Sequence, residues 1–225
     1  MIIVLFGPDG SGKTTQIRLL TSYFKARGVK FYKTYISTHH LFAWILFKIF
    51  VTAGHYIWRP NVYAQVEKYP SPEVFSSRLG KIIKYIVEGI SLLLAILLKV
   101  QLPSKLLKRL VIVERYIPSS LADFVCAFGI SSLNSILVRI LLALANDPKT
   151  VYVYLDADYE TLIKRRGIRI EPEDYIKTQR MIYKQFAKNY NCLIIDTSKL
   201  DILTTQKVIR EYIMEQYSKK LKVIV

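Results

Sequence analysis

The sequence is short of acidic side chains, and this shortage narrows the range of possible partners. It has 17 Asp and Glu residues against 33 Lys and Arg, a formal net charge of +16 at pH 7. Such an excess indicates anionic partners: nucleotides, nucleic acid or acidic lipid headgroups. The basic residues are scattered, without the aromatic-interleaved basic runs that bind single strands. We therefore expect a solvated basic surface and no nucleic-acid partner.

Cysteine is also scarce. Cys126 and Cys192 are the only two, and both lie in apolar contexts far apart in the chain. They provide neither a metal-ligand spacing nor a disulfide framework. We expect both to be small buried hydrophobic residues.

Long apolar runs are missing as well. Leu41–Phe47 and Ile49–Ile57 are interrupted, and Gly89–Leu98 is short, so none reaches the roughly 20 residues of a membrane-spanning helix. We expect no transmembrane segment: these stretches should be buried helices or a homodimer face, with peripheral membrane contact as the open alternative. The first apolar run ends at Gly7 without a basic segment before it, which does not fit a signal peptide. A cytoplasmic location is the expectation.

What the sequence does contain is an alternation of strand-like and helix-like segments. It predicts one α/β domain over residues 1–225, with a five-stranded parallel sheet flanked by helices on both faces. Ligands of such sheets bind beyond the carboxyl ends of the strands. The expected strands are Ile2–Phe6, Lys30–Ile36, Val111–Val113, Val151–Leu155 and Leu193–Ile195. The expected helices are Thr14–Arg27, Glu73–Leu98, Ser119–Phe128, Leu133–Ala145, Tyr159–Arg166, Glu173–Asn189 and Ile202–Gln216.

A phosphate-binding loop follows the first predicted strand. Gly7–Thr14 matches G-x-x-x-x-G-K-[ST] between a buried strand and a helix, the context that this motif requires. Glycines let backbone N–H groups surround phosphate oxygens, and the helix dipole favours the negative charge. Lys13 should reach the β- and γ-phosphates, and the Thr14 hydroxyl should bind Mg²⁺. The motif predicts a P-loop NTPase fold that binds a nucleoside triphosphate with Mg²⁺, but alone it does not separate kinases from GTPases or motor ATPases. The residues expected to hold ATP here are Gly7, Asp9, Gly10, Ser11, Gly12, Lys13, Thr14 and Thr15.

Four segments together resemble the thymidylate kinase family. The resemblance covers the phosphate loop and nearly everything from Val111 onward, whereas 31–108 matches poorly. The matching segments are Gly7–Gln16 (GPDGSGKTTQ), Glu114-Arg115-Tyr116, Leu155-Asp156 with Lys164-Arg165-Arg166 and Glu171 after it, and Asp196-Thr197-Ser198.

The resemblance implies a nucleoside monophosphate kinase, with dTMP and ATP converted to dTDP and ADP. Arg115 would hold the acceptor phosphate and Asp9 the acceptor sugar, roles that suit an arginine fork and a carboxylate. Glu114 replaces the family's aspartate and would orient Arg115 or a Mg²⁺-bound water. Ser198 would lie in the turn around the adenine. The resemblance also suggests a homodimer.

A short lid is expected around residues 164–172. Gly10 leaves the phosphate loop without an arginine, and family members of that kind supply the cation from the lid. Arg165, Arg166 and Arg169 are the candidates, beside a possible hinge at Gly167.

The acceptor side departs from the family pattern. Ser37–His40 stands in place of its Arg-Glu-Pro, so His39 and His40 become candidate acceptor contacts. The family's base-reading arginine is matched by Leu92–Ile96, which has no polar group for a base. Two alternatives therefore stay open. One is a P-loop kinase of another phosphorylated acceptor, lipid-linked for example, and the other is a nucleotide-dependent protein that binds nucleic acid or membrane.

Overall fold

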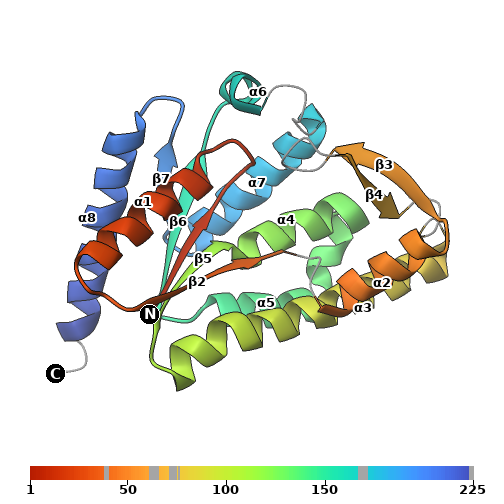
Figure 1. Ribbon diagram of the computed structural model, residues 1–225, viewed down its shortest axis with the longest axis horizontal. Coiled ribbons are helices and arrows are strands. Elements are labelled where there is room, and N and C mark those ends of the chain that lie inside the picture. The colour runs from red at the N-terminus through yellow and green to blue at the C-terminus, as the bar shows by residue number, and fades with distance from the viewer. Residues whose placement is uncertain (38–40, 61–65, 71–74, 76, 167–171, 223–225) are drawn as a thin grey trace.

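The computed structural model describes residues 1–37, 41–60, 66–70, 75, 77–166 and 172–222 (Figure 1). Five parallel strands form the main sheet, as the sequence predicts, and their order is β2-β5-β1-β6-β7. They are β1 (Ile2–Phe6), β2 (Phe31–Ile36), β5 (Leu110–Arg115), β6 (Thr150–Asp156) and β7 (Leu193–Asp196).

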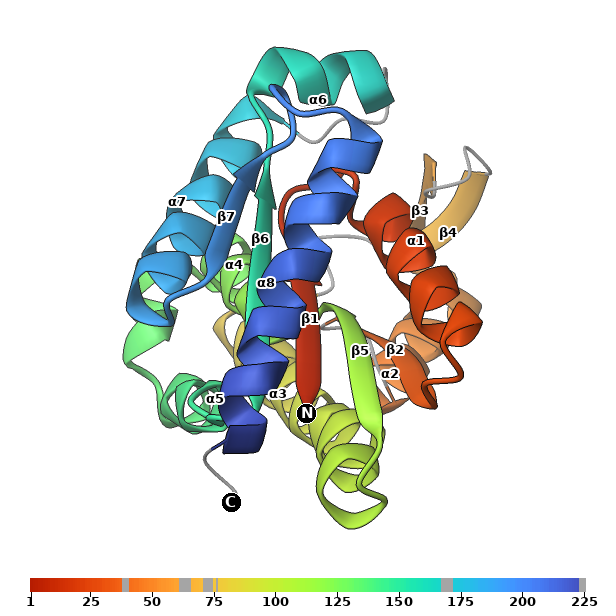
Figure 2. The same cartoon turned by 90° about the vertical axis from the view of Figure 1, so that its left-hand side faces the viewer.

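Helices cover both faces of this sheet. The α-helices of the described residues are α1 (Lys13–Ala26), α2 (Leu41–Thr52), α3 (Arg78–Ile96), α4 (Tyr116–Phe128), α5 (Ile136–Ala145), α6 (Tyr159–Arg166), α7 (Glu173–Asn189) and α8 (Ile202–Lys222). One face packs against α1 and α8, and the other against α3, α4, α5 and α7 (Figure 2).

The central strand explains the arrangement of the layers. All five residues of β1 are fully buried, since both faces of a parallel sheet are covered. Ile3 and Leu5 meet the side chains of α1 and α8, while Val4 and Phe6 meet those of α3, α4 and α7. The alternation therefore divides one strand between two apolar layers and fixes its register.

The described part of the chain adds elements that the sequence did not predict. An antiparallel pair, β3 (Tyr56–Pro60) and β4 (Val66–Pro70), forms a second, two-stranded sheet beside α2. Within α2 only Ala43 is buried among the residues whose side chains are described, so this stretch is not a buried helix.

The long helix predicted over 73–98 is divided differently. α3 begins at Arg78, because the Ser77 hydroxyl accepts a hydrogen bond from Gly80 N at 3.0 Å as an N-cap. The chain then continues as a π-helix, η2 (Leu97–Leu106), instead of ending. A short 3₁₀ segment, η3 (Ile130–Asn134), precedes α5. The helix α5 therefore begins only at Ile136, after a second serine N-cap, Ser135.

Two expectations about composition can be compared with the structure. Cys126 and Cys192 are half-buried rather than fully enclosed, and burial raises the pKa of the Cys192 thiol to about 12. Among the described helices, none combines the length and apolar character needed to cross a bilayer.

Candidate active site

The phosphate loop leaves β1 in a conformation that requires glycine. Gly7 has φ +147°, and a Cβ built there would lie 2.0 Å from the carbonyl oxygen of Leu155 on β6. The loop is therefore pressed against the neighbouring strand. Ser11 Oγ is buried within it and has no hydrogen-bond partner in the described part of the protein. A buried hydroxyl of this kind is a group that a phosphate oxygen could satisfy.

Gly7→Ala should therefore destabilise the protein by about 3 kcal/mol or more, since the methyl group must displace backbone. Gly28 is the matched control: its φ is +68°, but a Cβ there meets nothing within 4 Å. Gly28→Ala should cost only about 1 kcal/mol, the ordinary left-handed penalty. Urea unfolding of both variants measures the difference in the free energy of unfolding. Equal losses would show that the phosphate loop shifts to accommodate the methyl group.

Lys13 lies inside the loop with its amino group directed back across it. Its side chain is 4% exposed, and Nζ donates to Pro8 O at 2.8 Å and to Asp9 Oδ1 at 3.2 Å. Burial lowers the pKa of Lys13, and the Asp9 carboxylate opposes that shift. The amino group is thus desolvated and held by one anion, which prepares it for phosphate oxygens.

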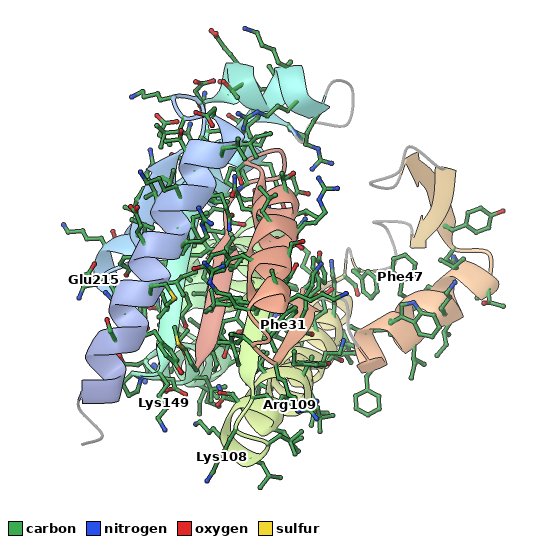
Figure 3. The ribbon with its side chains drawn as sticks, turned by 60° about the vertical axis from the view of Figure 1, so that its left-hand side comes forward. Phe31, Phe47, Lys108, Arg109, Lys149 and Glu215 are labelled. Atoms are coloured by element: carbon green, nitrogen blue, oxygen red, sulfur yellow. The ribbon has the colours of Figure 1, made fainter. Side chains whose placement is uncertain are left out.

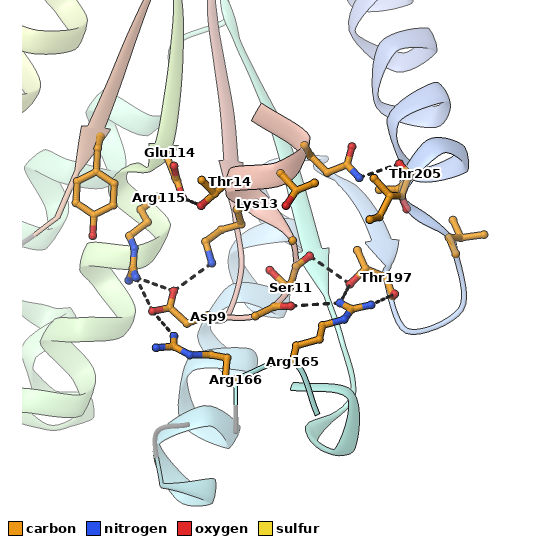
Figure 4. A pocket seen from close by; sticks show the side chains of 17 residues that line it. Asp9, Ser11, Lys13, Thr14, Glu114, Arg115, Arg165, Arg166, Thr197 and Thr205 are labelled. Atoms are coloured by element: carbon orange, nitrogen blue, oxygen red, sulfur yellow. Dashed lines mark hydrogen bonds and ion pairs between the residues drawn. The ribbon is translucent and has the colours of Figure 1, made fainter. Parts of the chain in front are cut away.

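Asp9 is the centre of the site. Its carboxylate accepts from Arg115 Nη2 at 2.6 and 2.7 Å, from Arg166 Nη1 at 2.7 Å and from Lys13 (Figure 4). Burial alone would raise the pKa of Asp9, but the three cations outweigh it and hold that pKa well below its usual range. Three cations around one carboxylate leave an excess of positive charge in the cleft.

Arg115 projects into the cleft from a strained turn between β5 and α4. Its φ is +75° and that of Tyr116 is +64°, conformations that are rare outside glycine. Burial would lower the pKa of the guanidinium, but Asp9 raises it, so the group stays charged. The guanidinium lies 5.6 Å from the ring centre of Tyr35, and its Nε is buried with no partner among the described residues.

Thr14 and Glu114 meet on the other side of the loop. Thr14 Oγ1 donates to Glu114 Oε1 at 2.6 Å, which joins the start of α1 to the end of β5. A hydroxyl and a carboxylate supply the hard oxygen ligands that Mg²⁺ prefers. No group of three or more His, Cys, Asp or Glu suited to a metal occurs among the described residues. The pair is therefore the candidate metal site.

The two neighbouring arginines of α6 have different contacts. Arg165 donates to Gly10 O at 3.2 Å and to Thr197 Oγ1 and O at 3.0 and 2.7 Å, so it braces the phosphate loop against the turn after β7. Arg166 turns into the cleft toward Asp9. A Cβ on Gly10 would lie 3.1 Å from Arg166 Cγ. The absence of a side chain at Gly10 thus makes room for the arginine of α6.

Sequence reasoning missed much of the network behind the loop. Thr197 Oγ1 also donates to the carbonyl oxygens of Ser11 and Asp156, at 3.2 and 3.0 Å. Arg180 pairs with the Asp156 carboxylate through two nitrogens at 2.8 and 2.9 Å, so it is held at β6 and does not face the loop. The positions of Asp156 and Thr197 at strand ends are signals that the sequence offers, whereas Arg180 in α7 has no such signal.

Ser198, which was predicted to lie in the turn around the adenine, is not among the described residues that line the cleft. Ser198 Oγ accepts from Asp158 N at 2.8 Å, which ties the turn to the start of α6. The cleft itself has a volume of about 940 Å³. Beyond the loop and the arginines, it is lined on this side by Thr197, Leu200, Ile202 and Thr205, and Thr15 is also part of the lining.

Of the predicted acceptor contacts, Asp9 and Arg115 line the cleft, whereas His39 and His40 lie outside the described residues. The lid residues Gly167, Arg169 and Glu171 also lie outside them.

The segment expected to face the acceptor base lies elsewhere. Leu92, Ala95 and Ile96 are fully buried in the core beneath the sheet, so they do not line a base pocket. Leu92–Ile96, the segment matched to the family's base-reading arginine, therefore supplies no polar group to the cleft. One turn earlier, Glu88 is a buried carboxyl whose pKa burial raises to about 7, beside Lys84 at 3.9 Å.

Comparison with known proteins places this site in context. No family model matches the sequence. A probable thymidylate kinase of Methanocaldococcus jannaschii is 26% identical over 204 residues, 90% of this chain and 89% of that protein. The crystal structure of a thymidylate kinase from Ehrlichia chaffeensis matches with a TM-score of 0.54 and 20% identity, over 95% of this chain and 98% of that one. The chain is therefore similar to thymidylate kinases over nearly its whole length, and it shares the fold of the Ehrlichia chaffeensis structure.

Proposed function

We propose that this protein is a nucleoside monophosphate kinase that transfers the γ-phosphoryl group of ATP to dTMP, giving dTDP and ADP. The observation that carries the proposal is the meeting of Lys13 and Arg115 at Asp9, from opposite sides of one cleft. One cation belongs to a loop built for a donor triphosphate, and the other is a buried arginine suited to an acceptor phosphate. A nucleotide-gated binding protein would have no need of the second.

The donor side fits ATP with Mg²⁺. Ser11 Oγ is a buried hydroxyl without a described partner, and the loop N–H groups precede α1, whose dipole favours phosphate. Thr14 and Glu114 would hold the metal, directly or through water. The chemistry that bound Mg²⁺ supplies is neutralisation of charge on the phosphate oxygens. Lys13 would place its amino group against the same oxygens.

The acceptor side requires an exchange of partners. Asp9 now holds Arg115 and Arg166, and an acceptor phosphate would compete with the carboxylate for both guanidinium groups. Once released, the Asp9 carboxylate can accept a hydrogen bond from a sugar hydroxyl. The cluster therefore keeps two arginines oriented and desolvated before substrate arrives, which reduces the reorganisation that transfer requires.

Arg166 is the cation we assign to the transferring group. It occupies the space that Gly10 leaves over the phosphate loop, whereas Arg165 is engaged with Thr197 and the loop backbone. Both belong to α6, so movement of the proposed lid at 164–172 would bring Arg166 over the cleft or withdraw it.

The decisive experiment is ADP release from Mg·ATP with each common ribo- and deoxyribonucleoside monophosphate. Turnover with dTMP well above the background ATPase rate supports the proposal, and a preference for another monophosphate keeps the reaction but changes the base. No stimulation by any monophosphate would overturn it. Other phosphorylated acceptors, including lipid-linked ones, then become the candidates.

We also propose a homodimer formed through α2 and the outer face of α3. Large apolar side chains are exposed on both helices, among them Phe42, Trp44 and Ile49 on α2 and Ile83 and Ile86 on α3. Contiguous exposed apolar surface of this kind is typical of subunit interfaces. Sedimentation equilibrium should give twice the chain mass, and Ile83→Asp/Ile86→Asp should give a monomer. A monomeric parent protein would contradict the interface.

A further inference from the structure

The π-helix η2 carries an exposed apolar stripe that the nucleotide site does not use. Leu107 N donates to Leu102 O at 3.2 Å, the i to i+5 pattern of a π-helix. Leu97 and Leu102 lie in η2, and Leu107 follows it directly. All three are exposed, and Leu106 at the end of the helix is 72% exposed. None of these leucines belongs to the hydrophobic core clusters of the described residues.

A hollow lined by basic side chains lies next to this tip. Its volume is about 700 Å³, and its charged lining residues are Lys25, Lys30, Lys108 and Arg109, with no acidic residue among them. Lys25 lies in the last turn of α1 and Lys30 just before β2, while Lys108 and Arg109 lie between η2 and β5. Four exposed cations without a counter-charge give a locally positive surface.

The positive surface continues toward β6. Lys105 and Lys149 are both exposed there, and Asp147 is the acid beside them, 3.8 Å from the Lys105 amino group. Figure 3 shows Lys108, Arg109 and Lys149 gathered at the lower end of the molecule. One acid among these cations leaves a clear positive excess.

This end of the molecule is opposite the proposed active site. The tip and the basic connections lie at the amino-terminal edge of the parallel sheet, while Glu114 and Arg115 lie at its carboxyl-terminal edge. The six residues of β5 separate the two, a length of about 20 Å. A partner bound at the tip would leave the cleft open to solvent.

We propose that this tip, defined as Leu102, Leu106 and Leu107 with the surrounding basic side chains, docks the protein on an anionic lipid bilayer. Charge complementarity selects the occupant: lysines and arginine meet acidic headgroups, while the leucines enter the boundary of the acyl chains. A second copy on the same surface would bring like charges together. Nucleic acid would satisfy the cations but leaves the leucines without a role. The proposal does not depend on the nucleotide chemistry.

The test is sedimentation of the full chain with vesicles of two compositions. Vesicles of phosphatidylcholine with about 30% phosphatidylserine should bind the protein, and phosphatidylcholine alone should bind it weakly, because each basic side chain near an anionic surface adds attraction. Binding should fall as salt is raised. Equal binding to both compositions, or none to either, would overturn the proposal.

Two double variants separate the apolar and the charged contributions. Leu106→Ser/Leu107→Ser and Lys108→Glu/Arg109→Glu should each lower vesicle partitioning at least about tenfold, while folding is unaffected because all four side chains are exposed. Lys188→Glu/Lys207→Glu changes the net charge by the same amount, with exposed lysines of α7 and α8. This control should keep most of the binding.

Other outcomes would identify a different occupant. If the control pair loses as much binding as Lys108→Glu/Arg109→Glu, the overall net charge of the protein, and not this surface, causes the vesicle binding, which contradicts the proposal. If the leucine pair changes the sedimentation mass, the tip is a subunit interface. If the leucine pair binds vesicles normally and the charge pair loses duplex DNA binding, the partner is nucleic acid. ADP release by the leucine pair in solution should equal that of the parent. A failure of the docking proposal can therefore be distinguished from a failure of the proposed kinase function.

Discussion

Replacement of Lys13 by alanine should lower the rate of ADP formation with ATP and dTMP at least about a thousandfold. The amino group lies on the phosphate loop, 2.8 Å from Pro8 O and next to Asp9, and it is desolvated. Alanine removes the cation that would meet the β- and γ-phosphates. Phosphoryl transfer depends almost wholly on positioning and charge stabilisation, so no other group replaces it.

The same substitution should leave the fold intact. Arg115 and Arg166 continue to neutralise Asp9, and removing a buried amino group also removes its desolvation cost. We expect a thermal midpoint within about 4 °C of the parent without ligand. ATP, which should raise the midpoint of the parent protein, should no longer raise that of the variant.

Lys25→Ala is the matched control, because Lys25 is an exposed lysine at the far end of the same helix. It should retain parental turnover. Substantial ADP formation by Lys13→Ala, with the monophosphate still required, would mean that the loop does not hold the donor phosphates as we propose.

The parallel sheet was predictable because its signals are local. Each strand is a short apolar run followed by a helical pattern, and burial on both faces requires such continuous runs. The π-helix after α3 and the hairpin of β3 and β4 were not predictable in this way. Pro60 and Pro70 stand at the ends of the paired strands, and proline in a short run favours a loop or an edge over a strand.

In the candidate site, motif residues were identified but their partners were not. Spacing selects Lys13 and Thr14, whereas the position of Arg166 over Gly10 depends on how α6 packs against the loop. Thr197 bonds to residues 41 and 186 positions away, and no local pattern encodes such pairs. The burial of Leu92, Ala95 and Ile96 has the same origin, because it depends on how α3 packs against the sheet and the neighbouring helices.

Arg115→Ala should impair use of the acceptor far more than use of ATP. We expect kcat/KM for dTMP to fall about a hundredfold to a thousandfold, the usual loss when one charged contact to a reacting phosphate is removed. The background ATPase rate should change little, because the phosphate loop and the Thr14–Glu114 pair are untouched. Initial rates at varied dTMP and varied ATP separate the two effects.

The backbone strain at Arg115 allows a sharper test of its role, because a residue with a side chain is unfavourable in this conformation. At φ +75° the residue costs about 1–3 kcal/mol, and stability alone would favour glycine there. Arg115→Gly should therefore unfold no more easily than Arg115→Ala, while its kcat/KM for dTMP falls by the same factor.

Arg115→Lys keeps the charge but not the planar fork, and should recover only part of kcat/KM. Arg139→Ala, at an exposed arginine of α5, is the control and should behave as the parent. If the alanine and glycine variants keep parental kcat/KM for dTMP, Arg115 is a structural partner of Asp9, and the acceptor phosphate binds elsewhere.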